Sequence, residues 1–504
     1  MKKRILRNSL LFLIIFLCVL LIFAASWIKG TFGLVTFDEI LFHLTVPLDG
    51  TNSSYIFDFI FTALLPSIFI SLIVIFIVCY NYKYSLDFII NFRGKDLTLK
   101  LFPFTKIIKI LGCIIFCLYS IIFIIKELDI KSYIDDIKHP STFIEEVYVE
   151  PSTANITFPD KKRNLIYIYL ESMESSYASV DDGGIVYVNT IPNLTKLAKE
   201  NISFSNTDKL GGALNMTGTH WTMAAMVAQS SGLPLKVSIS GNSYGRYEKF
   251  LPGVTTIGDI LEENGYNQTL LIGSRATFGG REKFYTQHGN YNIWDWDSSV
   301  EDGLYKEEDY EWWGFEDSEL YEYAKDELTR LSSSDKPFNL TMLTVDTHFE
   351  DGWISEGCML PYAEQYMNVI SCADTMLMKF LDWLKTQSYY KDTTIVIAGD
   401  HLTMDMNFFN DYDPNYIRTS YNVFINSSVN TKNIKNRTFA TVDLFPTTLA
   451  SLGATFDGDR LALGTNLFSD SKTIFEEYGY DYVNEELKSK STFYTNKFIL
   501  NNIK

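Results

Sequence analysis

Three long apolar runs lie in the first quarter of the chain. They cover residues 8–28, about 59–80 and about 107–125, and they contain almost no charged residue. About 20 consecutive apolar residues in a helix span the hydrocarbon core of a bilayer. The first run also resembles a signal peptide, but it ends in Trp27-Ile28-Lys29 instead of a small-residue cleavage site, and two more runs follow it. We therefore predict an anchor of three transmembrane helices over residues 1–126.

The charges around these runs predict how the anchor is oriented. The N-terminus and the second loop are basic, whereas the first loop, residues 29–58, is acidic; the residues concerned are Lys2, Lys3, Arg4, Arg7, Lys83, Arg93, Lys95, Lys100 and Lys106 on one side and Asp38, Glu39, Asp49 and Asp58 on the other. Loops rich in Lys and Arg stay in the cytoplasm. Everything after about residue 126 is therefore expected on the extracytoplasmic side of a cell membrane, attached to a multi-pass anchor.

After a polar stretch at 127–162, which we predict to be a linker, the hydrophobic pattern changes. Apolar runs of strand length alternate with stretches of helical spacing; the strands are expected within 163–177, 255–274, 336–348 and 393–401, and the helices at 193–201, within 255–274, at 372–387 and at 441–453. Such alternation is typical of βαβ units. We predict an α/β domain over 163–504, with a mainly parallel sheet flanked by helices.

Polar residues follow three of the expected strands. These residues are Glu171, His348 and the pair Asp400-His401. Ligands of open α/β sheets bind at the carboxyl ends of the strands, and a mixed carboxylate and imidazole set suits Mn²⁺, Mg²⁺ or Zn²⁺. The alternative is structural: Asp400 as a helix cap, His401 as a hydrogen-bonded rim histidine and Glu171 as a solvated carboxylate.

A candidate nucleophile lies in residues 215–235, NMTGTHWTMAAMVAQSSGLPL. Gly218 allows a tight turn, Thr219 follows it, and the next residues have helical composition. The start of a helix favours a phosphate, and a metal contact activates a hydroxyl. The alternative is that Thr219 or Thr222 is an N-cap. Further along, Arg281 is either a clamp for phosphate oxygens or an ordinary surface residue.

Charge and cysteine content limit the function of the outer part of the chain. The formal net charge is −18, which argues against nucleic acid as a partner because binding nucleic acid needs a basic surface. Four of the six cysteines lie in the apolar runs. The remaining two, Cys358 and Cys372, form either a disulfide or two buried thiols.

Several segments together resemble one family. They are, in chain order, NLIYIYLESMESSY, TIPNLTKLAKENISF, TGTHWTMAAMVAQSSGLPL, IGDILEENGYNQTLLIGS, FGGREKFYTQHG, VDTH, CADTMLMKFLDWL, IVIAGDHL and VDLFPTTLASLG. Residues from about 160 to 470 resemble the sulfatase/alkaline-phosphatase superfamily, specifically its phosphoglycerol transferase branch. That branch includes lipoteichoic acid synthases and the phosphoglycerol transferase I of periplasmic glucan synthesis. ESMES and GTHWTMAAMVAQ look most like the glucan type.

The resemblance implies a role for each candidate. Residues Glu171, Thr219, Asp400 and His401 would hold one divalent metal, most often Mn²⁺ in the family, with Mg²⁺ or Zn²⁺ as alternatives. Thr219 would be the nucleophile, and Arg281 and His348 would bind the glycerophosphate. Lipoteichoic acid synthases carry a Trp two residues before this Arg, where this chain has Gly279, so Phe278 or Trp221 would line the pocket instead.

The resemblance also implies a reaction. Glycerol phosphate would be transferred from phosphatidylglycerol, through a Thr-linked intermediate, to an envelope glycan or a polyglycerol phosphate chain. Phosphoethanolamine transferases are the alternative, although their first strand tends to end in Gly-Glu-Ser/Thr-X-Arg whereas this chain has Leu170-Glu171-Ser172-Met173-Glu174. Sulfatases proper are disfavoured because no Cys-X-Pro-X-Arg or Ser-X-Pro-X-Arg motif is present. A non-catalytic protein that binds envelope glycan or lipid is a further alternative.

Overall fold

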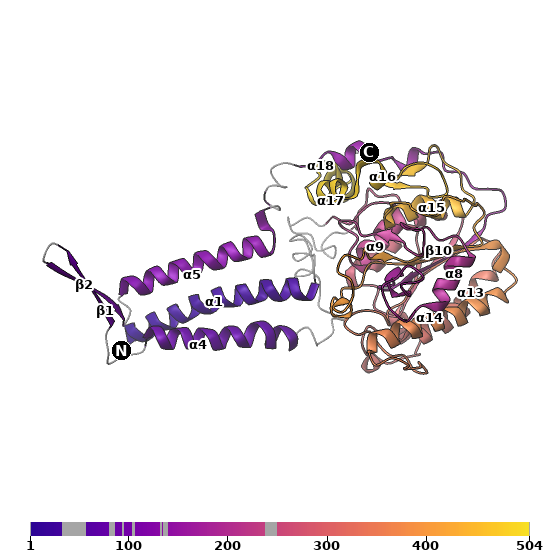
Figure 1. The fold of residues 1–504 in the computed structure, drawn as a ribbon. Coiled ribbons are helices and arrows are strands. Elements are labelled where there is room, and N and C mark those ends of the chain that lie inside the picture. Colours follow the sequence, from indigo (N-terminus) through magenta and orange to yellow (C-terminus); the bar gives the residue numbers. More distant parts are fainter. Residues whose placement is uncertain are drawn as a thin grey trace. The chain divides into compact units, whose positions relative to one another are not determined.

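The computed structural model of the chain describes residues 2–32, 57–79, 86–92, 95–102, 106–131, 134, 140–236 and 249–502. These residues form two compact units, one with the N-terminal helices and one with the residues from 140 onward. Each unit is described on its own below (Figure 1).

The first unit contains three helices that are long and apolar enough to cross a membrane, over Asn8–Thr31, Phe57–Val78 and Ile107–Glu127. They coincide with the three predicted runs. The elements of this unit are α1 (Lys2–Phe32), a π-helical segment (Ile60–Leu64) leading into α4 (Leu65–Cys79), the antiparallel hairpin β1 (Leu86–Phe92) and β2 (Lys95–Phe102), and α5 (Lys106–Glu127). Many of the loop charges that predict the orientation, namely Asp38, Glu39, Asp49, Lys83 and Arg93, lie outside the described residues.

The second unit is built around a six-stranded sheet, in the order β10-β8-β3-β7-β5-β6. Its strands are β3 (Asn164–Leu170), β5 (Asn267–Ile272), β6 (Asn292–Trp294), β7 (Phe338–Leu343), β8 (Thr393–Gly399) and β10 (Asn422–Ile425). All neighbouring pairs are parallel except β10 with β8. The predicted α/β class with a mainly parallel sheet is confirmed.

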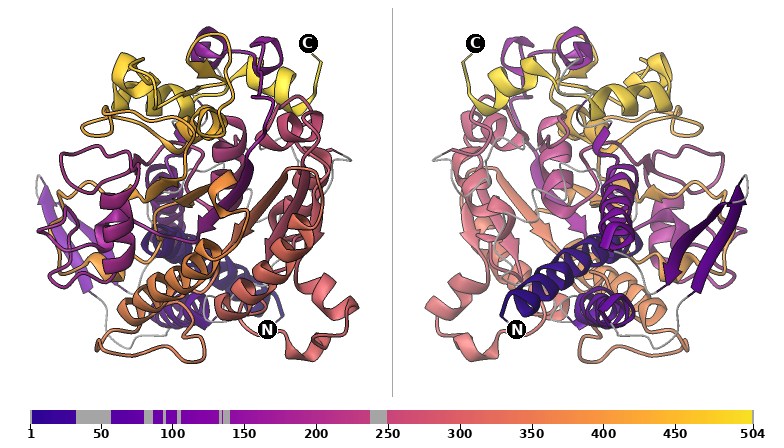
Figure 2. Two further views of the ribbon diagram at one scale, coloured as in Figure 1. Left: turned by 90° about the vertical axis from the view of Figure 1, so that its right-hand side faces the viewer. Right: turned by 90° about the vertical axis from the view of Figure 1, so that its left-hand side faces the viewer.

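Helices cover both faces of this sheet (Figure 2). Alternate side chains of β3 enter two separate cores: Leu165, Tyr167 and Tyr169 enter one, and Ile166 and Ile168 enter the other. This period of two is what a strand buried on both faces requires. The helices of the first core include α9 (Thr222–Ser231), α10 (Ile257–Glu263), α11 (Arg281–Gln287) and α15 (Leu444–Ser451), and those of the second include α8 (Pro192–Glu200), α13 (Asp317–Ser332) and α14 (Gln365–Lys385).

Shorter elements complete the second unit. They are α7 (Phe143–Val147), α12 (Trp296–Glu301), α16 (Ile474–Tyr478), α17 (Tyr480–Lys488), α18 (Thr492–Tyr494) and the two-residue strands β4 (Ala213–Leu214), β9 (Thr419–Ser420), β11 (Arg460–Leu461) and β12 (Gly464–Thr465). Helix α7 belongs to the stretch predicted as a linker, yet Phe143 and Ile144 are buried in the first core. Cys358 and Cys372 form a disulfide, which decides between the two alternatives left open by the sequence.

Candidate metal and phosphate site

Glu171, Asp400 and His401 lie together at the carboxyl edge of the sheet. Each offers one ligand atom, and these atoms all lie within 4.8 Å of one another. The strand register explains why these residues lie together. Strands β3 and β8 are neighbours, and Leu170 pairs with Gly399. Glu171 and Asp400, the next residue of each strand, therefore lie side by side. All three side chains are buried, and Asp400 is 0% exposed.

Backbone N–H groups hold the Asp400 carboxylate in place, and a side-chain hydroxyl holds that of Glu171. The backbone N–H groups of Ser172 and His401 both donate to Asp400 Oδ1, at 2.8 and 2.7 Å. Ser172 adopts a φ of 52°, so the chain turns sharply just after Glu171. The Ser172 hydroxyl in turn donates to Glu171 Oε1 at 2.8 Å. Both carboxylates are therefore fixed before any ligand arrives.

The His401 ring is oriented by its own backbone neighbour. Its Nδ1 lies 2.8 Å from the Leu402 carbonyl oxygen, an acceptor, so Nδ1 carries the proton. The other nitrogen, Nε2, then faces the carboxylates, 3.3 Å from Glu171 Oε1 and 3.4 Å from Asp400 Oδ2. A ring nitrogen fixed in this way is the usual arrangement of a metal-binding histidine.

Burial and mutual charge interactions shift the pKa of each member of this cluster. Burial raises the pKa of Glu171, but the adjacent His401 outweighs it and the net pKa lies well below the usual range. Burial and the Glu171 charge raise the pKa of Asp400 well above its usual range. Burial lowers the pKa of His401, but the two carboxylates raise it to about 10. Among described residues, the buried Asp400 Oδ2 accepts no hydrogen bond, which leaves it available as a ligand.

Two threonines near the cluster differ in what their hydroxyls contact. Thr222 Oγ1 lies 3.1 Å from Glu171 Oε2, to which it donates, and 3.4 Å from His401 Nε2. The hydroxyl of Thr219, the nucleophile implied by the resemblance, instead donates to the Met216 carbonyl at 2.8 Å. The structure therefore brings Thr222, and not the Thr219 hydroxyl, into contact with the candidate ligands.

The sequence explains where helix α9 begins. Gly218 adopts a φ of +82°, and a Cβ there would come within 2.9 Å of Pro234, so the turn needs glycine. Trp221 is extended (φ −140°, ψ 160°) and is the N-cap, which makes Thr222 the first helical residue. The first N–H groups of a helix attract anions. Trp221 itself is largely buried among core residues.

Arg281 begins helix α11 after two glycines with positive φ, Gly279 and Gly280. Its Nε and one terminal nitrogen donate to the Phe278 and Arg275 carbonyls, both at 3.0 Å. Burial lowers its pKa to about 10, although the charges of Tyr310 and Glu171 oppose this effect. A buried guanidinium held by carbonyls and influenced by Glu171 suits a phosphate oxygen.

His348 follows β7 in a loop lined by aromatic rings. Its Nδ1 contacts the Phe349 carbonyl oxygen at 2.8 Å, and its ring lies 4.7 Å from the Trp313 ring. Trp313 in turn contacts Phe278, at 5.1 Å between centroids, and Phe278 lies under the Arg281 guanidinium at 5.5 Å. Burial lowers the pKa of His348, whereas the Glu171 charge opposes this shift.

One buried pair near the cluster was missed by the sequence reasoning. Glu174 is 0% exposed and accepts the Thr403 backbone N–H at 2.9 Å and the Arg418 Nε at 2.9 Å. Arg418 also donates to the Thr403 carbonyl at 2.7 Å. This pair therefore joins the loop after β3 to the loop that follows His401.

Comparison with known proteins identifies the family. Residues 163–454 match the Sulfatase family. Phosphoglycerol transferase I of Escherichia coli O6:K15:H31 is 34% identical over 267 residues, which are 51% of this chain and 33% of that protein. The same-named protein of Salmonella choleraesuis is 33% identical over the same length. The chain thus spans about a third of the length of these curated relatives.

One solved structure shares the fold, and a second aligns with part of the chain. The integral membrane lipooligosaccharide phosphoethanolamine transferase A (EptA) from Neisseria meningitidis aligns over 96% of this chain and 87% of its own, with a TM-score of 0.50 and 12% identity. The lipoteichoic acid synthase LtaP from Listeria monocytogenes aligns over 65% of this chain and 80% of its own, with a TM-score of 0.49 and 18% identity. By its sequence match over most of the second unit, the chain belongs to the Sulfatase family.

Proposed function

We propose that the chain transfers glycerol phosphate from phosphatidylglycerol to an acceptor hydroxyl of the cell envelope, with Thr222 as the nucleophile. The observation that carries this proposal is the Thr222 hydroxyl, which lies at a helix start and contacts Glu171 and His401 at once. The relatives named phosphoglycerol transferase I support the choice of transferred group. The reaction is placed on the extracytoplasmic side, following the loop charges.

The metal-binding part of the proposal rests on the donor set. Glu171, Asp400, His401 and the Thr222 hydroxyl would hold one divalent ion, with Mn²⁺ first and Mg²⁺ or Zn²⁺ as alternatives. Such an ion would lower the pKa of the Thr222 hydroxyl and offset charge on the phosphoryl oxygens. A threonine hydroxyl is otherwise a weak nucleophile, and the ion would make it reactive enough to attack phosphorus.

In the first half-reaction, Thr222 Oγ1 attacks the phosphorus of phosphatidylglycerol. The bond between phosphorus and the diacylglycerol oxygen breaks, and glycerophospho-Thr222 forms. The hydroxyl proton ends on the leaving diacylglycerol oxygen, and the Nε2 atom of His348 is our candidate carrier, because Nδ1 is engaged by the Phe349 carbonyl. Arg281 holds the phosphoryl oxygens, and positioning with charge stabilisation is the main task in such transfers.

In the second half-reaction, an acceptor hydroxyl attacks the same phosphorus. The bond to Thr222 Oγ1 breaks, the acceptor gains glycerol phosphate, and its proton returns to Thr222. The N-terminal helices give this chemistry a physical advantage, since anchoring the site at a membrane raises the effective concentration of a lipid donor.

The test is lipid turnover by the full-length protein in detergent with Mn²⁺, comparing labelled phosphatidylglycerol with labelled phosphatidylethanolamine. We expect diacylglycerol from phosphatidylglycerol alone, and a loss of about a thousandfold or more in Thr222→Ala. Thr219→Ala is the matched control and should retain activity. Loss in Thr219→Ala with activity in Thr222→Ala would return the role to Thr219. Release from phosphatidylethanolamine would make the protein a phosphoethanolamine transferase.

A further inference from the structure

The hairpin of β1 and β2 lies in the chain between two of the long apolar helices, α4 and α5 (Figure 1). Its strands have the sequences LDFIINF and KDLTLKLF, and it belongs to the first unit, not to the unit of the candidate site. A two-stranded hairpin alone is marginally stable in water at best, and it gains stability when an apolar face packs against another surface.

The strand register divides the hairpin into two unlike faces. Phe88 pairs with Leu99, and Ile90 pairs with Leu97. Directly paired residues of antiparallel strands lie on the same face, and successive residues along a strand alternate between the faces. One face therefore carries these four apolar residues, and we call it the apolar face of the hairpin.

The opposite face is mainly polar. Across the strands, Asn91 Nδ2 donates to Asp96 Oδ1 at 2.8 Å. The paired residues of this face are Asp87 with Lys100, Ile89 with Thr98, and Asn91 with Asp96. We call it the polar face of the hairpin, and its composition suits contact with water.

The apolar residues of β1 are uncovered within the described part of the chain. Phe88 is 57% exposed and Ile90 is 43% exposed. Single exposed apolar side chains are common on soluble proteins. Two neighbours on one face of a ladder, paired with two leucines, instead form a continuous apolar surface, which marks a site of interaction.

The connections of the hairpin limit what can cover this surface. Residues 80–85 join it to Cys79, the last residue of α4, and residues 103–105 join it to Lys106, the first residue of α5. A fully extended chain spans at most about 3.6 Å per residue, so these connections reach about 25 Å and about 14 Å. If α4 and α5 cross a bilayer, as the sequence predicts, the hairpin is held close to the bilayer surface.

The charges of this region complement an anionic surface. Basic residues outnumber acidic ones across residues 80–106; they are Lys83, Arg93, Lys95, Lys100 and Lys106, against Asp87 and Asp96. Anionic lipids attract basic segments that lie next to a membrane-crossing helix. Lys and Arg side chains can also bury their aliphatic stems and keep the charged group at the level of the headgroups.

We propose that the hairpin of β1 and β2 docks by its apolar face on an anionic lipid bilayer, the same bilayer that the N-terminal helices are predicted to cross. The apolar face enters the boundary between headgroups and acyl chains, and the polar face stays in water. Because the hairpin joins α4 to α5, docking fixes the depth of both helices. The inference is independent of the proposed function, since it uses no residue of the second unit.

Two adjacent isoleucines provide a matched test. Ile90 lies on the apolar face, and Ile89, 64% exposed, lies on the polar face. Ile90→Cys and Ile89→Cys are made separately in the full-length protein and spin-labelled, after the cysteines of the apolar runs, Cys18, Cys79, Cys113 and Cys117, are replaced by Ala. The protein is placed in nanodiscs of phosphatidylcholine, alone or mixed with an equal part of phosphatidylglycerol.

Electron paramagnetic resonance then measures how far oxygen and a water-soluble nickel complex reach each label. In the anionic nanodiscs we expect the label at residue 90 to be open to oxygen and protected from nickel, and the label at residue 89 to be open to nickel. Equal nickel accessibility at the two residues would overturn docking. Protection at residue 90 that requires two copies in one nanodisc would assign the apolar face to a second copy of the chain and overturn the proposal.

The contribution of charge is tested with Lys95→Gln/Lys100→Gln. We expect the ratio of protected to exposed label at residue 90 to fall about fivefold for each lysine removed. Lys161→Gln/Lys196→Gln, which changes two exposed lysines of the second unit, is the matched control and should leave the ratio unchanged. Equal protection in neutral and anionic nanodiscs would overturn the choice of an anionic surface.

Amide hydrogen exchange of the unmutated full-length protein tests the same proposal without any substitution. Docking should slow exchange across residues 86–102 in the anionic nanodiscs relative to the neutral ones. Exchange that is equally fast in both would overturn the proposal even where a labelled variant fails to form the hairpin.

Discussion

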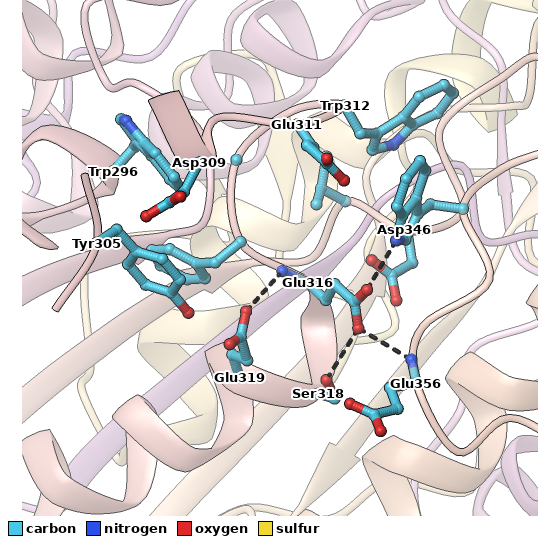
Figure 3. Close-up of a pocket in the computed structure, with 14 residues that line it drawn as sticks. Trp296, Tyr305, Asp309, Glu311, Trp312, Glu316, Ser318, Glu319, Asp346 and Glu356 are labelled. Carbon is cyan, nitrogen blue, oxygen red and sulfur yellow. Dashed lines mark hydrogen bonds between the residues drawn. The ribbon is translucent and has the colours of Figure 1, made fainter. Parts of the chain in front are cut away.

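The metal cluster and the acidic cavity are both rich in carboxylates, yet they are built in opposite ways. In the cluster, two carboxylates and an imidazole are buried and converge within 4.8 Å. The acidic cavity has a volume of about 220 Å³ and is lined by aromatic rings and six carboxylates (Figure 3). These belong to Asp309, Glu311, Glu316, Glu319, Asp346 and Glu356. The cluster offers mixed O and N ligands to a small ion, whereas the cavity offers dispersed acceptors and apolar faces to a larger molecule.

The contrast shows that negative charge alone does not identify a metal site. What distinguishes the cluster is that hydrogen bonds hold its metal-ligand atoms in fixed directions. Asp400 receives two backbone N–H groups, and His401 is oriented by a carbonyl. In the cavity, Glu311 and Glu356 are exposed and free to adapt to a ligand. The experiments below either separate these two regions or show that they act as one.

The largest effect is expected from a change in the cluster. Asp400→Asn keeps the shape but removes the charge of a ligand, so we expect the purified protein to hold divalent metal substoichiometrically. Metal content by mass spectrometry, after purification in Mn²⁺, measures it.

The cavity variant Glu311→Gln/Glu356→Gln is the control and should hold metal as the unmutated protein does. If the cavity variant loses metal while Asp400→Asn retains it, the assignment of the two regions is reversed. Unchanged metal content in both would place the ion elsewhere.

A smaller effect is expected from Glu174→Gln. This change keeps the shape of the side chain near Asp400 and His401 but removes one charge of a buried pair. Arg418 would lose its charged partner but keep the Thr403 carbonyl, and the loop after His401 would be held less firmly. Outer residues of this kind typically alter metal affinity or activity by about 10–100-fold. Metal titration with a competing chelator measures the affinity.

Glu476→Gln provides a matched control, because Glu476 pairs with the buried Arg437 at 2.8 Å in another part of the unit. Both variants should lose stability, but only Glu174→Gln should lose metal affinity. Equal affinities in the two variants would reduce the Glu174 pair to a structural role.

The position of the cluster could be predicted because it depends on local features of the sequence. Each of β3 and β8 is a continuous apolar run that ends in a polar residue, and neighbouring parallel strands end at the same edge. Glu171, Asp400 and His401 could therefore be expected together, as could the α/β class. The strand β7 is shorter than its apolar run, ending at Leu343, so His348 lies in a loop and not at a strand end.

The identity of the nearby hydroxyl could not be read in the same way. Whether Thr219 or Thr222 faces the cluster depends on where helix α9 begins, and the ends of elements are set by hydrogen bonds that composition does not show. Here the turn at Gly218 uses the Thr219 hydroxyl on Met216. The Glu174–Arg418 pair is 244 residues apart in the chain, and the cavity draws on three segments, so neither leaves a local signal.

The smallest effect distinguishes the two regions by pH. Burial raises the pKa of Asp346, in the cavity, to about 7, so the folded protein holds this proton more tightly than the unfolded chain does. The resulting stability is fully present below about pH 4 and is lost as the pH rises through about 7. The free energy at stake is about 1.4 kcal/mol per unit of pKa difference. Burial and the Asp346 charge raise the pKa of its partner Asp317 as well, which acts in the same direction.

Asp346→Asn should therefore flatten the fall in melting temperature between pH 5 and pH 8, measured by calorimetry on the metal-free full-length protein. The variant is expected to gain relative to the unmutated protein at pH 8 and not at pH 5. Glu356→Gln, an exposed carboxylate of the same cavity, should leave the profile unchanged. An identical decline in Asp346→Asn would show that the pH dependence of stability arises outside the cavity. The Asp346 carboxyl would then have the same pKa as the exposed carboxyls.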